Sequence, residues 1–285
     1  MQDEVLKIDA VVPFHLKDEG TLNWCVQGIR NHLDVARILV VCNREYRPQV
    51  EGANAMFFDE DTVVEGLTAR SFPHERWGWY FQQILKLGMA DWVDTEYYLV
   101  VDADTVFLKP VSFFDAEGRP LYVTASEYHR PYFDTFEELF GFKAVHEYSF
   151  VAHHMVFNRH IVREMRQRFR RCSPWFENIV QYMDSSSNCG CFSEYETYGH
   201  YVKAVHPEEI QIRPLKWINV PLSPSHGLFR HLSRYYDYCS LHAYMRGDGS
   251  LARRAWRRTR FELKMMKAQL GLIGHGTEVG RSQPV

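Results

Sequence analysis

The first part of the chain alternates short apolar runs with one amphipathic segment. The runs at 8–15, 38–42 and 55–58 are dominated by apolar residues, as in strands that are buried on both faces of a sheet. Residues 21–33 carry apolar side chains at spacings of three and four, which predicts a helix with Thr21 as its N-cap. Strand, helix and strand in this order form a βαβ unit, so we predict a parallel, nucleotide-binding type of sheet. Ligands of such sheets bind beyond the carboxyl ends of the strands.

The stretch 96–110 predicts a buried strand that ends in two carboxylates. Five apolar residues at 97–101 lead directly into Asp102 and Asp104. Because strand side chains alternate between faces, we expect the two aspartates to point the same way. Two carboxylates on one face can hold a divalent cation and leave coordination positions for phosphate oxygens. The simpler interpretation is a solvated strand end, and the chain contains a second such triplet at 59–61.

The segments around this strand predict the elements that cover and extend the sheet. Residues 70–90 contain a helix with a broad apolar surface that ends at Gly88. We expect strands at 121–125 and 149–157, with an aromatic loop at 128–133 between them. Two further helices are expected at 160–171 and 175–182.

A helix start is predicted at residue 193. Ser193 and Glu196 match the Ser-x-x-Glu capping box, with Ser193 as N-cap and Glu196 as its reciprocal partner. Glu194 then lies in the first turn and has no local structural role.

The segment 251–270 differs in character from the rest of the chain. It carries seven cations against one anion. A basic amphipathic helix with a Trp fits an anionic membrane surface, whereas a C-terminal helix packed on the domain with a solvated basic face is the alternative. Residues from Gly271 onward are expected to form a frayed tail. The apolar side chains that fall near one helical stripe are Ala252, Trp256, Leu263, Met266 and Leu270.

Composition and charge exclude several classes of protein. A chain of 285 residues with 46% hydrophobic residues can form a packed core, in one large domain or two small ones. The net charge of -3 gives no reason to expect a nucleic-acid partner. The first residues are acidic where a signal peptide would be basic, and no apolar run approaches the ~20 residues that span a bilayer. We therefore expect a cytoplasmic protein, free or peripheral on the inner face of the membrane.

The cysteines predict neither disulfides nor a zinc site. Six of them are scattered through a chain that shows no export signal, so we expect reduced thiols. Cys189-Gly190-Cys191 has no second pair at ligand spacing, whereas structural zinc sites use four ligands.

Four blocks, in the same order along the chain, resemble a group of bacterial and viral glycosyltransferases of the GT-A fold. They are Val12-Pro13, 76–87, 98–105 and 192–199. The chain is also similar to a domain family long described as having unknown function and often associated with surface polysaccharides. This resemblance runs from about residue 8 to about 245. It implies an α/β fold with a mixed central sheet, a catalytic domain at 1–245, and a basic amphipathic helix and tail at 246–285.

The resemblance also implies a metal and donor site. In GT-A enzymes the Asp-x-Asp binds Mn²⁺ or Mg²⁺ and, through the metal, the diphosphate of a nucleotide sugar, linked here to uridine or guanosine diphosphate. This role falls to Asp102 and Asp104, with a late histidine as a further ligand: His242, or His226 as second choice. The complete set of residues assigned to donor binding is Val12, Pro13, Asp59, Arg76, Gln83, Lys86, Asp102, Ala103, Asp104 and His154.

Some of these residues have more specific expected roles. Asp59 is expected to contact the base or the ribose. Lys86 and Arg76 lie just upstream of the acidic strand, where a diphosphate needs cationic partners. His153 and His154 face opposite sides of a strand, so one is structural and either could touch the donor sugar; we assign His154.

The sequence therefore predicts a metal-dependent glycosyltransferase that acts on a hydroxyl of a glycan or glycolipid. Glu194 is the general base, with Glu196 in reserve, and inversion is the expected outcome. One alternative is a sugar-phosphate nucleotidyltransferase. Those enzymes resemble one another in a glycine-rich, basic loop after the first strand, whereas the loop at 15–20 has a single glycine, which counts against this alternative. The other alternative is a non-catalytic, membrane-associated interaction module that binds through its basic C-terminal helix.

Overall fold

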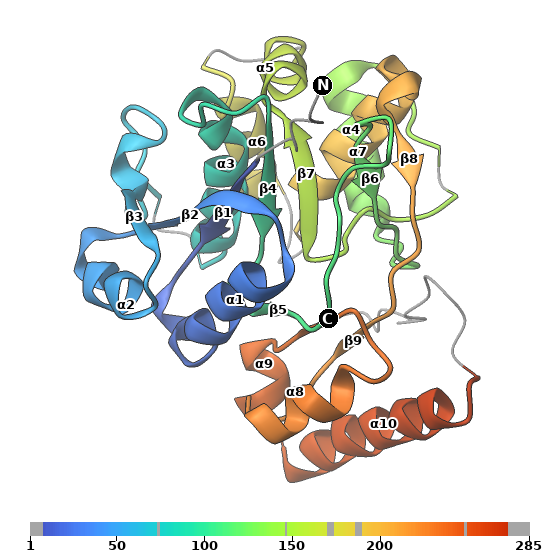
Figure 1. Ribbon diagram of the computed structural model, residues 1–285. Helices are drawn as coiled ribbons and strands as arrows, with labels where there is room; N and C mark the ends of the chain where they lie inside the picture. Colours follow the sequence, from blue (N-terminus) through green and yellow to red (C-terminus); the bar gives the residue numbers. More distant parts are fainter. Residues whose placement is uncertain are drawn as a thin grey trace, which may run out of the picture.

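A central five-stranded sheet organises the protein, with helices on both of its faces and two smaller sheets beside it (Figure 1). Among the described residues, no helix is long and apolar enough to cross a bilayer. The computed structural model describes residues 8–72, 75–145, 147–169, 174–185, 190–247 and 250–272.

The central sheet has the order β3-β2-β1-β4-β7. β1 is parallel to both β2 and β4, β2 is parallel to β3, and β7 is antiparallel to β4. The parallel βαβ opening and the mixed α/β sheet are therefore confirmed. The strands are β1 Ile8–Pro13, β2 Val35–Cys42, β3 Met56–Asp59, β4 Tyr97–Val101 and β7 His154–Asn158.

The two smaller sheets are built from short strands. In one, β10 lies between β5, to which it is antiparallel, and β9, to which it is parallel. In the other, β6 pairs with β8. Their bounds are β5 Thr105–Phe107, β9 Trp217–Asn219, β10 Tyr238–Ser240, β6 Leu121–Tyr122 and β8 Gln211–Ile212.

The predicted helices are present and differ from the observed ones mainly at their ends. The first begins two residues earlier than predicted, with Asp18 as N-cap, while the Thr21 hydroxyl donates to the Asp18 carbonyl inside the first turn. The helices are α1 Glu19–His32, α2 Arg47–Gly52, α3 Trp77–Gly88, α4 Arg130–Phe140, α5 Arg159–Gln167, α6 Glu177–Ser185, α7 Glu194–Val205, α8 His226–Leu232, α9 Ala243–Gly247 and α10 Leu251–Gln269.

The aromatic loop predicted at 128–133 is wrong, because α4 begins within it. Pro131 lies in the first turn, where its missing N–H costs no helical hydrogen bond, and Gly141 ends the helix in the left-handed conformation at φ 74°. Tyr132 and Phe133 of this segment therefore lie on a helix. Phe133 and Phe136 are buried in the core that covers the sheet.

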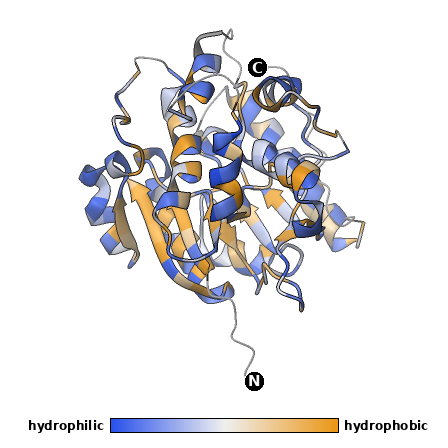
Figure 2. Ribbon diagram, turned by 90° about the horizontal axis from the view of Figure 1, so that it is seen from above, coloured by the Kyte–Doolittle hydropathy of each residue, from blue (hydrophilic) through white to orange (hydrophobic). Residues whose placement is uncertain are grey.

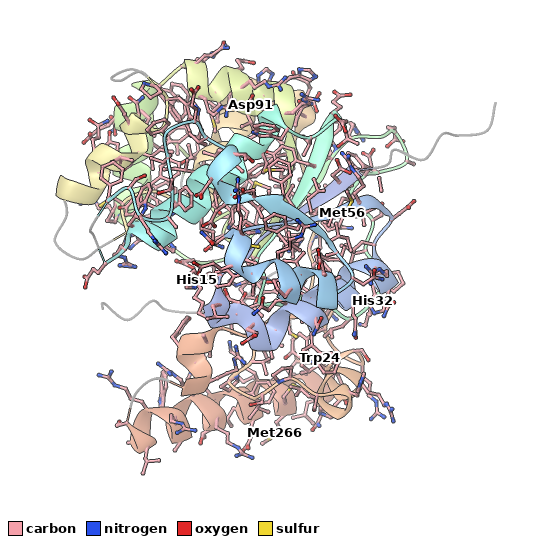
Figure 3. The ribbon with its side chains drawn as sticks, turned by 90° about the vertical axis from the view of Figure 1, so that its left-hand side faces the viewer. His15, Trp24, His32, Met56, Asp91 and Met266 are labelled. Carbon is pink, nitrogen blue, oxygen red and sulfur yellow. The ribbon has the colours of Figure 1, made fainter. Side chains whose placement is uncertain are left out.

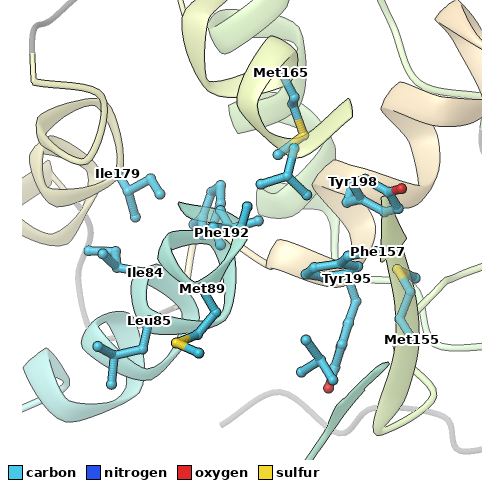
Figure 4. Packing of buried hydrophobic residues seen from close by; sticks show 14 of the residues in the cluster. Ile84, Leu85, Met89, Met155, Phe157, Met165, Ile179, Phe192, Tyr195 and Tyr198 are labelled. Atoms are coloured by element: carbon cyan, nitrogen blue, oxygen red, sulfur yellow. The ribbon is translucent and has the colours of Figure 1, made fainter. Parts of the chain in front are cut away.

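The strands of the central sheet face two separate hydrophobic cores. Val11, Val41 and Val100 lie in the core formed with α3 to α7. Their neighbours Val12 and Val40 lie in the core formed with α1 and α2. Figure 2 shows the apolar sheet between these helical layers, and Figure 4 shows the packing in the first core, where Phe157 lies against Tyr195 and Tyr198. Along each strand, alternate side chains therefore pack into one core, and the side chains between them pack into the other.

Candidate active site

A buried ion-pair cluster lies at the carboxyl end of β4. The Lys86 ammonium at the end of α3 lies 2.6 Å from Asp102 Oδ1 and 2.5 Å from Glu194 Oε1. The Tyr195 hydroxyl donates to the same Asp102 oxygen at 3.0 Å, and its ring lies under the ammonium at 4.3 Å. The side chains of Lys86 and Glu194 are only 4% exposed, whereas that of Asp102 is 20% exposed. Asp102 therefore presents the open side of the cluster.

Strand parity explains why Asp102 joins this cluster. Alternate residues along a strand face the same side, so Asp102 faces the same side as Val100. That side is covered by the layer that contains α3 and α7. Lys86 lies in the last turn of α3, and Glu194 in the first turn of α7. Gln83 joins these two helices, because its side-chain oxygen accepts a hydrogen bond from the Glu194 N–H at 3.0 Å. Gln83 is thus buried between helices, away from the open side of the cluster.

Burial and the neighbouring charges act in opposite directions on these groups. Burial would raise the pKa of Asp102, but Lys86 and His153 outweigh burial and hold that pKa well below its usual range. Burial would lower the pKa of Lys86, but Asp102 and Glu194 raise it. For Glu194, burial raises the pKa, Asp102 adds to this effect, and Lys86 opposes it. One ammonium therefore faces two carboxyl groups, which leaves the cluster attractive to a further cation.

Asp104 is positioned by a turn and a second sheet. The Thr105 N–H donates to the Asp102 carbonyl, so residues 102–105 turn instead of continuing the strand. The prediction that both aspartates share one strand face is therefore wrong, because β4 ends at Val101. β5 then pairs with β10, and this pairing brings His242 to Asp104, with Nδ1 2.8 Å from Oδ2.

Two histidines connect the two aspartates. His153 Nδ1 lies 3.5 Å from Asp102 Oδ2, and the rings of His153 and His242 are 4.8 Å apart. His153 adopts a positive φ of 64°, a backbone conformation that costs energy for a residue other than glycine. The other oxygen of Asp104, Oδ1, is buried and has no hydrogen-bond partner among the described residues.

The chemical types of the side chains at this site suit a hard divalent cation. Carboxylate oxygens of Asp102 and Asp104 suit Mn²⁺ or Mg²⁺, His242 adds an imidazole, and the unpartnered Oδ1 of Asp104 is a ready ligand. Within the described ranges, no group of three or more His, Cys, Asp or Glu side chains is already arranged around one metal position. Asp102 is instead held by Lys86, so its orientation is set before any cation binds.

Two further carboxyl groups at this edge have no counterpart in the sequence predictions. The pKa of Asp18 is raised to about 6, chiefly by burial and also by the charges of Asp104 and Asp102, against the opposing effect of Lys17. Burial also raises the pKa of Glu127, which interacts electrostatically with His153. The position of Asp18 in the loop that follows β1 could have revealed it, because ligands bind beyond strand ends. No local signal marks Glu127.

His154 and His226 lie away from the aspartates, so both expectations need correction. His154 is 2% exposed, and neither ring nitrogen has a hydrogen-bond partner in the described structure. Its ring packs against Phe107 and Tyr238, and burial lowers its pKa to about 3. Of the two adjacent histidines, His153 is the one at the site. The ring of His226 packs against Trp24, at 4.7 Å between centroids.

Glu196 has a structural role, but not the predicted one. Ser193 is the N-cap of α7 and accepts a hydrogen bond from the Glu196 N–H at 3.3 Å. The Glu196 carboxylate does not return to Ser193, because it accepts the Phe150 N–H at 3.0 Å and lies 3.2 Å from His200. The reciprocal half of the capping box is therefore wrong, and Glu196 connects α7 to the segment before β7.

The remaining residues predicted to bind the donor are either buried or make other side-chain contacts. Val12, Pro13 and Ala103 are buried and can offer only backbone atoms to a ligand. Asp59 forms an ion pair with Arg44 and accepts the Asp61 N–H at 3.2 Å. The guanidinium of Arg76 lies over the Trp79 ring, 5.3 Å from its centroid. The donor contacts expected of these residues stay predictions.

Comparison with known proteins places the chain in a family. It belongs to the Family of unknown function (DUF6492), whose model matches residues 6–213. No curated protein matches it. Solved structures with a similar chain course include glycosyltransferases. Mouse xyloside xylosyltransferase 1 is 10% identical, with 85% of this chain and 100% of that chain covered and a TM-score of 0.46. The bifunctional glycosyltransferase WbbM is 11% identical (93% and 52% covered, TM-score 0.45), and the galactosyltransferase LgtC is 14% identical (91% and 96% covered, TM-score 0.43).

Proposed function

We propose that this protein is a metal-dependent glycosyltransferase that moves a sugar from a UDP- or GDP-linked donor to a hydroxyl of a glycan or glycolipid. The observation that carries the proposal is the position of the acidic groups. In the order β3-β2-β1-β4, the chain leaves β1 toward β2 and later returns to the other side of β1 as β4. Ligands of open α/β sheets bind at such a reversal, and Asp18 and Asp102 follow the two strands that flank it.

The proposed site divides its charges between metal binding and positioning. Asp102, Asp104 and His242 would hold Mn²⁺ or Mg²⁺, which supplies positive charge to a departing nucleoside diphosphate. Lys86 is nearly inaccessible and contacts Asp102 directly, so we assign it the role of orienting Asp102 instead of contacting the diphosphate. His153 orients the second oxygen of the same carboxylate.

A carboxylate that accepts the proton of the acceptor hydroxyl completes the proposal. Burial raises the pKa of Glu194 toward the range in which a general base works best, but its side chain is as inaccessible as that of Lys86, so it would reach an acceptor hydroxyl only once the cluster has opened. Attack by the acceptor oxygen on the anomeric carbon would then break the bond to the diphosphate and invert the configuration. Glu127 is a second candidate, because its carboxyl group is half-buried near His153 and has a raised pKa.

Thermal stability with and without ligands tests the proposal, with the second Asp-x-Asp triplet as a matched control. UDP or GDP with Mn²⁺ should raise the melting temperature of the wild-type protein and of Asp61→Asn, because a ligand that binds only the native state stabilises it. Asp104→Asn should lose this metal-dependent shift. An equal shift in Asp104→Asn and Asp61→Asn would show that the nucleotide binds elsewhere.

Turnover assays then distinguish the reactions. Release of nucleoside diphosphate from a nucleotide sugar, with loss in Asp104→Asn, is the expected result. Release of pyrophosphate from a sugar phosphate and a nucleoside triphosphate would instead identify a nucleotidyltransferase. Glu194→Gln and Glu127→Gln, measured side by side, identify the base as the variant that loses turnover while its metal-dependent nucleotide shift remains.

A further inference from the structure

The C-terminal helix α10 has two apolar faces that point in opposite directions. Phe261, Met265 and Ala268 form its inner face and are buried in a core cluster. The apolar stripe predicted from the sequence is a different one. Trp256 is 51% exposed and Met266 is 52% exposed. The members of this outer stripe recur at helical spacing: Ala252, Trp256, Leu263, Met266 and Leu270.

A row of cations separates the two faces along one side of α10. Consecutive residues of a helix are rotated by about 100° around its axis. Each cation of the row comes one position after an outer-stripe residue or one position before an inner-face residue, so it lies between the two faces. The guanidinium of Arg260 lies over the Trp256 ring, 4.7 Å from its centroid. The row recurs at intervals of four and three residues and consists of Arg253, Arg257, Arg260, Lys264 and Lys267.

We propose that the outer stripe of α10 docks on an anionic membrane surface. An exposed apolar stripe that contains a Trp and is bordered by cations is the pattern of a helix that lies in the plane of the lipid interface. The charge of 251–270, seven cations against one anion, is complementary to anionic headgroups and unsuited to a self-complementary contact between two copies. Figure 3 places Met266 at the outer edge of the molecule.

The inner face of α10 connects this surface to the acidic site. Its core cluster includes Val106 of β5 and Leu241, which directly precedes His242. The Leu241 N–H donates to the Asp104 carbonyl at 2.8 Å. Figure 1 shows α10 below the edge of the central sheet where β5 lies. A membrane-bound α10 would therefore hold this edge close to the lipid surface, where a lipid-linked acceptor of the proposed transferase would be found.

A cationic cavity lies on the inner side of α10, at its C-terminal end. It has a volume of about 330 Å³, and Ala268 and Gly271 form part of its wall. Lys109, Lys216 and Arg234 also line it, and Lys109 lies 3.6 Å from Asp237. Three cations against one carboxylate favour an anionic group such as a lipid phosphate.

Vesicle co-sedimentation of the full chain tests the docking surface. The wild-type protein should sediment with vesicles of phosphatidylcholine and phosphatidylglycerol, less in high salt, and not with phosphatidylcholine alone. Met266→Glu should weaken binding at least about tenfold, because it removes an apolar anchor and adds a repelled charge. Met56→Glu is the matched control, since Met56 is 50% exposed on β3, away from α10. Lys267→Glu tests the cation row in the same way, with Lys143→Glu as its control, because the Lys143 side chain is 78% exposed and lies outside α10.

The outcomes decide between a membrane and other occupants. Equal vesicle binding by Met266→Glu and Met56→Glu, or equal binding to neutral and anionic vesicles, would overturn the proposal. So would a concentration-dependent dimer that Met266→Glu abolishes in the absence of vesicle binding, because the outer stripe would then contact a second copy. Release of nucleoside diphosphate with a water-soluble acceptor, measured separately, reports only on the proposed function.

Discussion

The chain contains two Asp-x-Asp triplets at the carboxyl ends of parallel strands, and the structure gives them different surroundings. Asp102 follows the interior strand β4 and contacts a buried ammonium. Asp59 ends the edge strand β3, and its carboxylate pairs with an Arg44 side chain that is 74% exposed. The same sequence pattern thus produces a buried charge cluster in one place and a turn with a partly exposed ion pair in the other.

The two triplets should differ most in how much stability is lost when the cationic side chain that pairs with each one is removed. Lys86→Met should lower the free energy of unfolding by about 3–5 kcal/mol, because it leaves two buried carboxyl groups without their counter-charge. Arg44→Met should cause a far smaller loss, since water already screens that pair. Urea unfolding at neutral pH measures both, and equal losses would contradict the distinction.

The triplets should also respond to pH in opposite directions. Burial raises the pKa of Glu60 from 4.5 to about 7, so the folded state binds a proton that the unfolded state has released. Stability should therefore fall as the pH rises from about 5 to about 8, by about 1–2 kcal/mol from this group. Asp102 has a lowered pKa, so its stabilising contribution is present at neutral pH and is lost as the pH falls below about 4.

Glu60→Gln separates these two effects. The variant should match the wild-type protein near pH 5 and exceed its stability near pH 8, in urea unfolding measured at both values. An unchanged slope between them would mean that Glu60 is ionised in the folded protein. The loss of stability below pH 4 should remain in this variant, because it arises at the other triplet.

The smallest expected effect is the loss of one hydroxyl. Tyr195→Phe removes the hydrogen bond to Asp102 but keeps the ring under Lys86, which should cost about 1 kcal/mol of stability and lower turnover about tenfold. Tyr182→Phe removes a similar bond of 3.0 Å to Glu138 and should cost about as much stability without changing turnover. If both variants keep full turnover, Tyr195 has no role in orienting Asp102.

Several parts of the fold could be predicted because their signals are local. The buried runs of β1, β2 and β4 are continuous and apolar, as expected of parallel strands covered on both faces. The N-cap Ser193 and the helix it starts also follow from neighbouring residues. The α4 helix was missed because aromatic residues suit loops and packed helices equally well, and only the core that receives Phe136 distinguishes the two.

The candidate site was only partly predictable, because its contacts join distant segments. Lys86 and Glu194 are 108 positions apart, and Asp104 and His242 are 138 positions apart. The resemblance to GT-A enzymes suggested these residues as site residues, but it did not predict the ion pair that buries Lys86. It also selected His154, whose orientation toward the core depends on the pairing of β7 with β4.

By itself, the sequence determined where the buried strands run, that α10 is basic and amphipathic, and that acidic groups stand at strand ends. These features depend on residue type and on spacing within one element. Only the tertiary structure decided which acidic triplet meets a buried ammonium, which histidine reaches Asp104, and which stripe of α10 faces outward. The reason is that burial and charge pairing depend on which distant elements cover a residue, and local spacing does not contain that information.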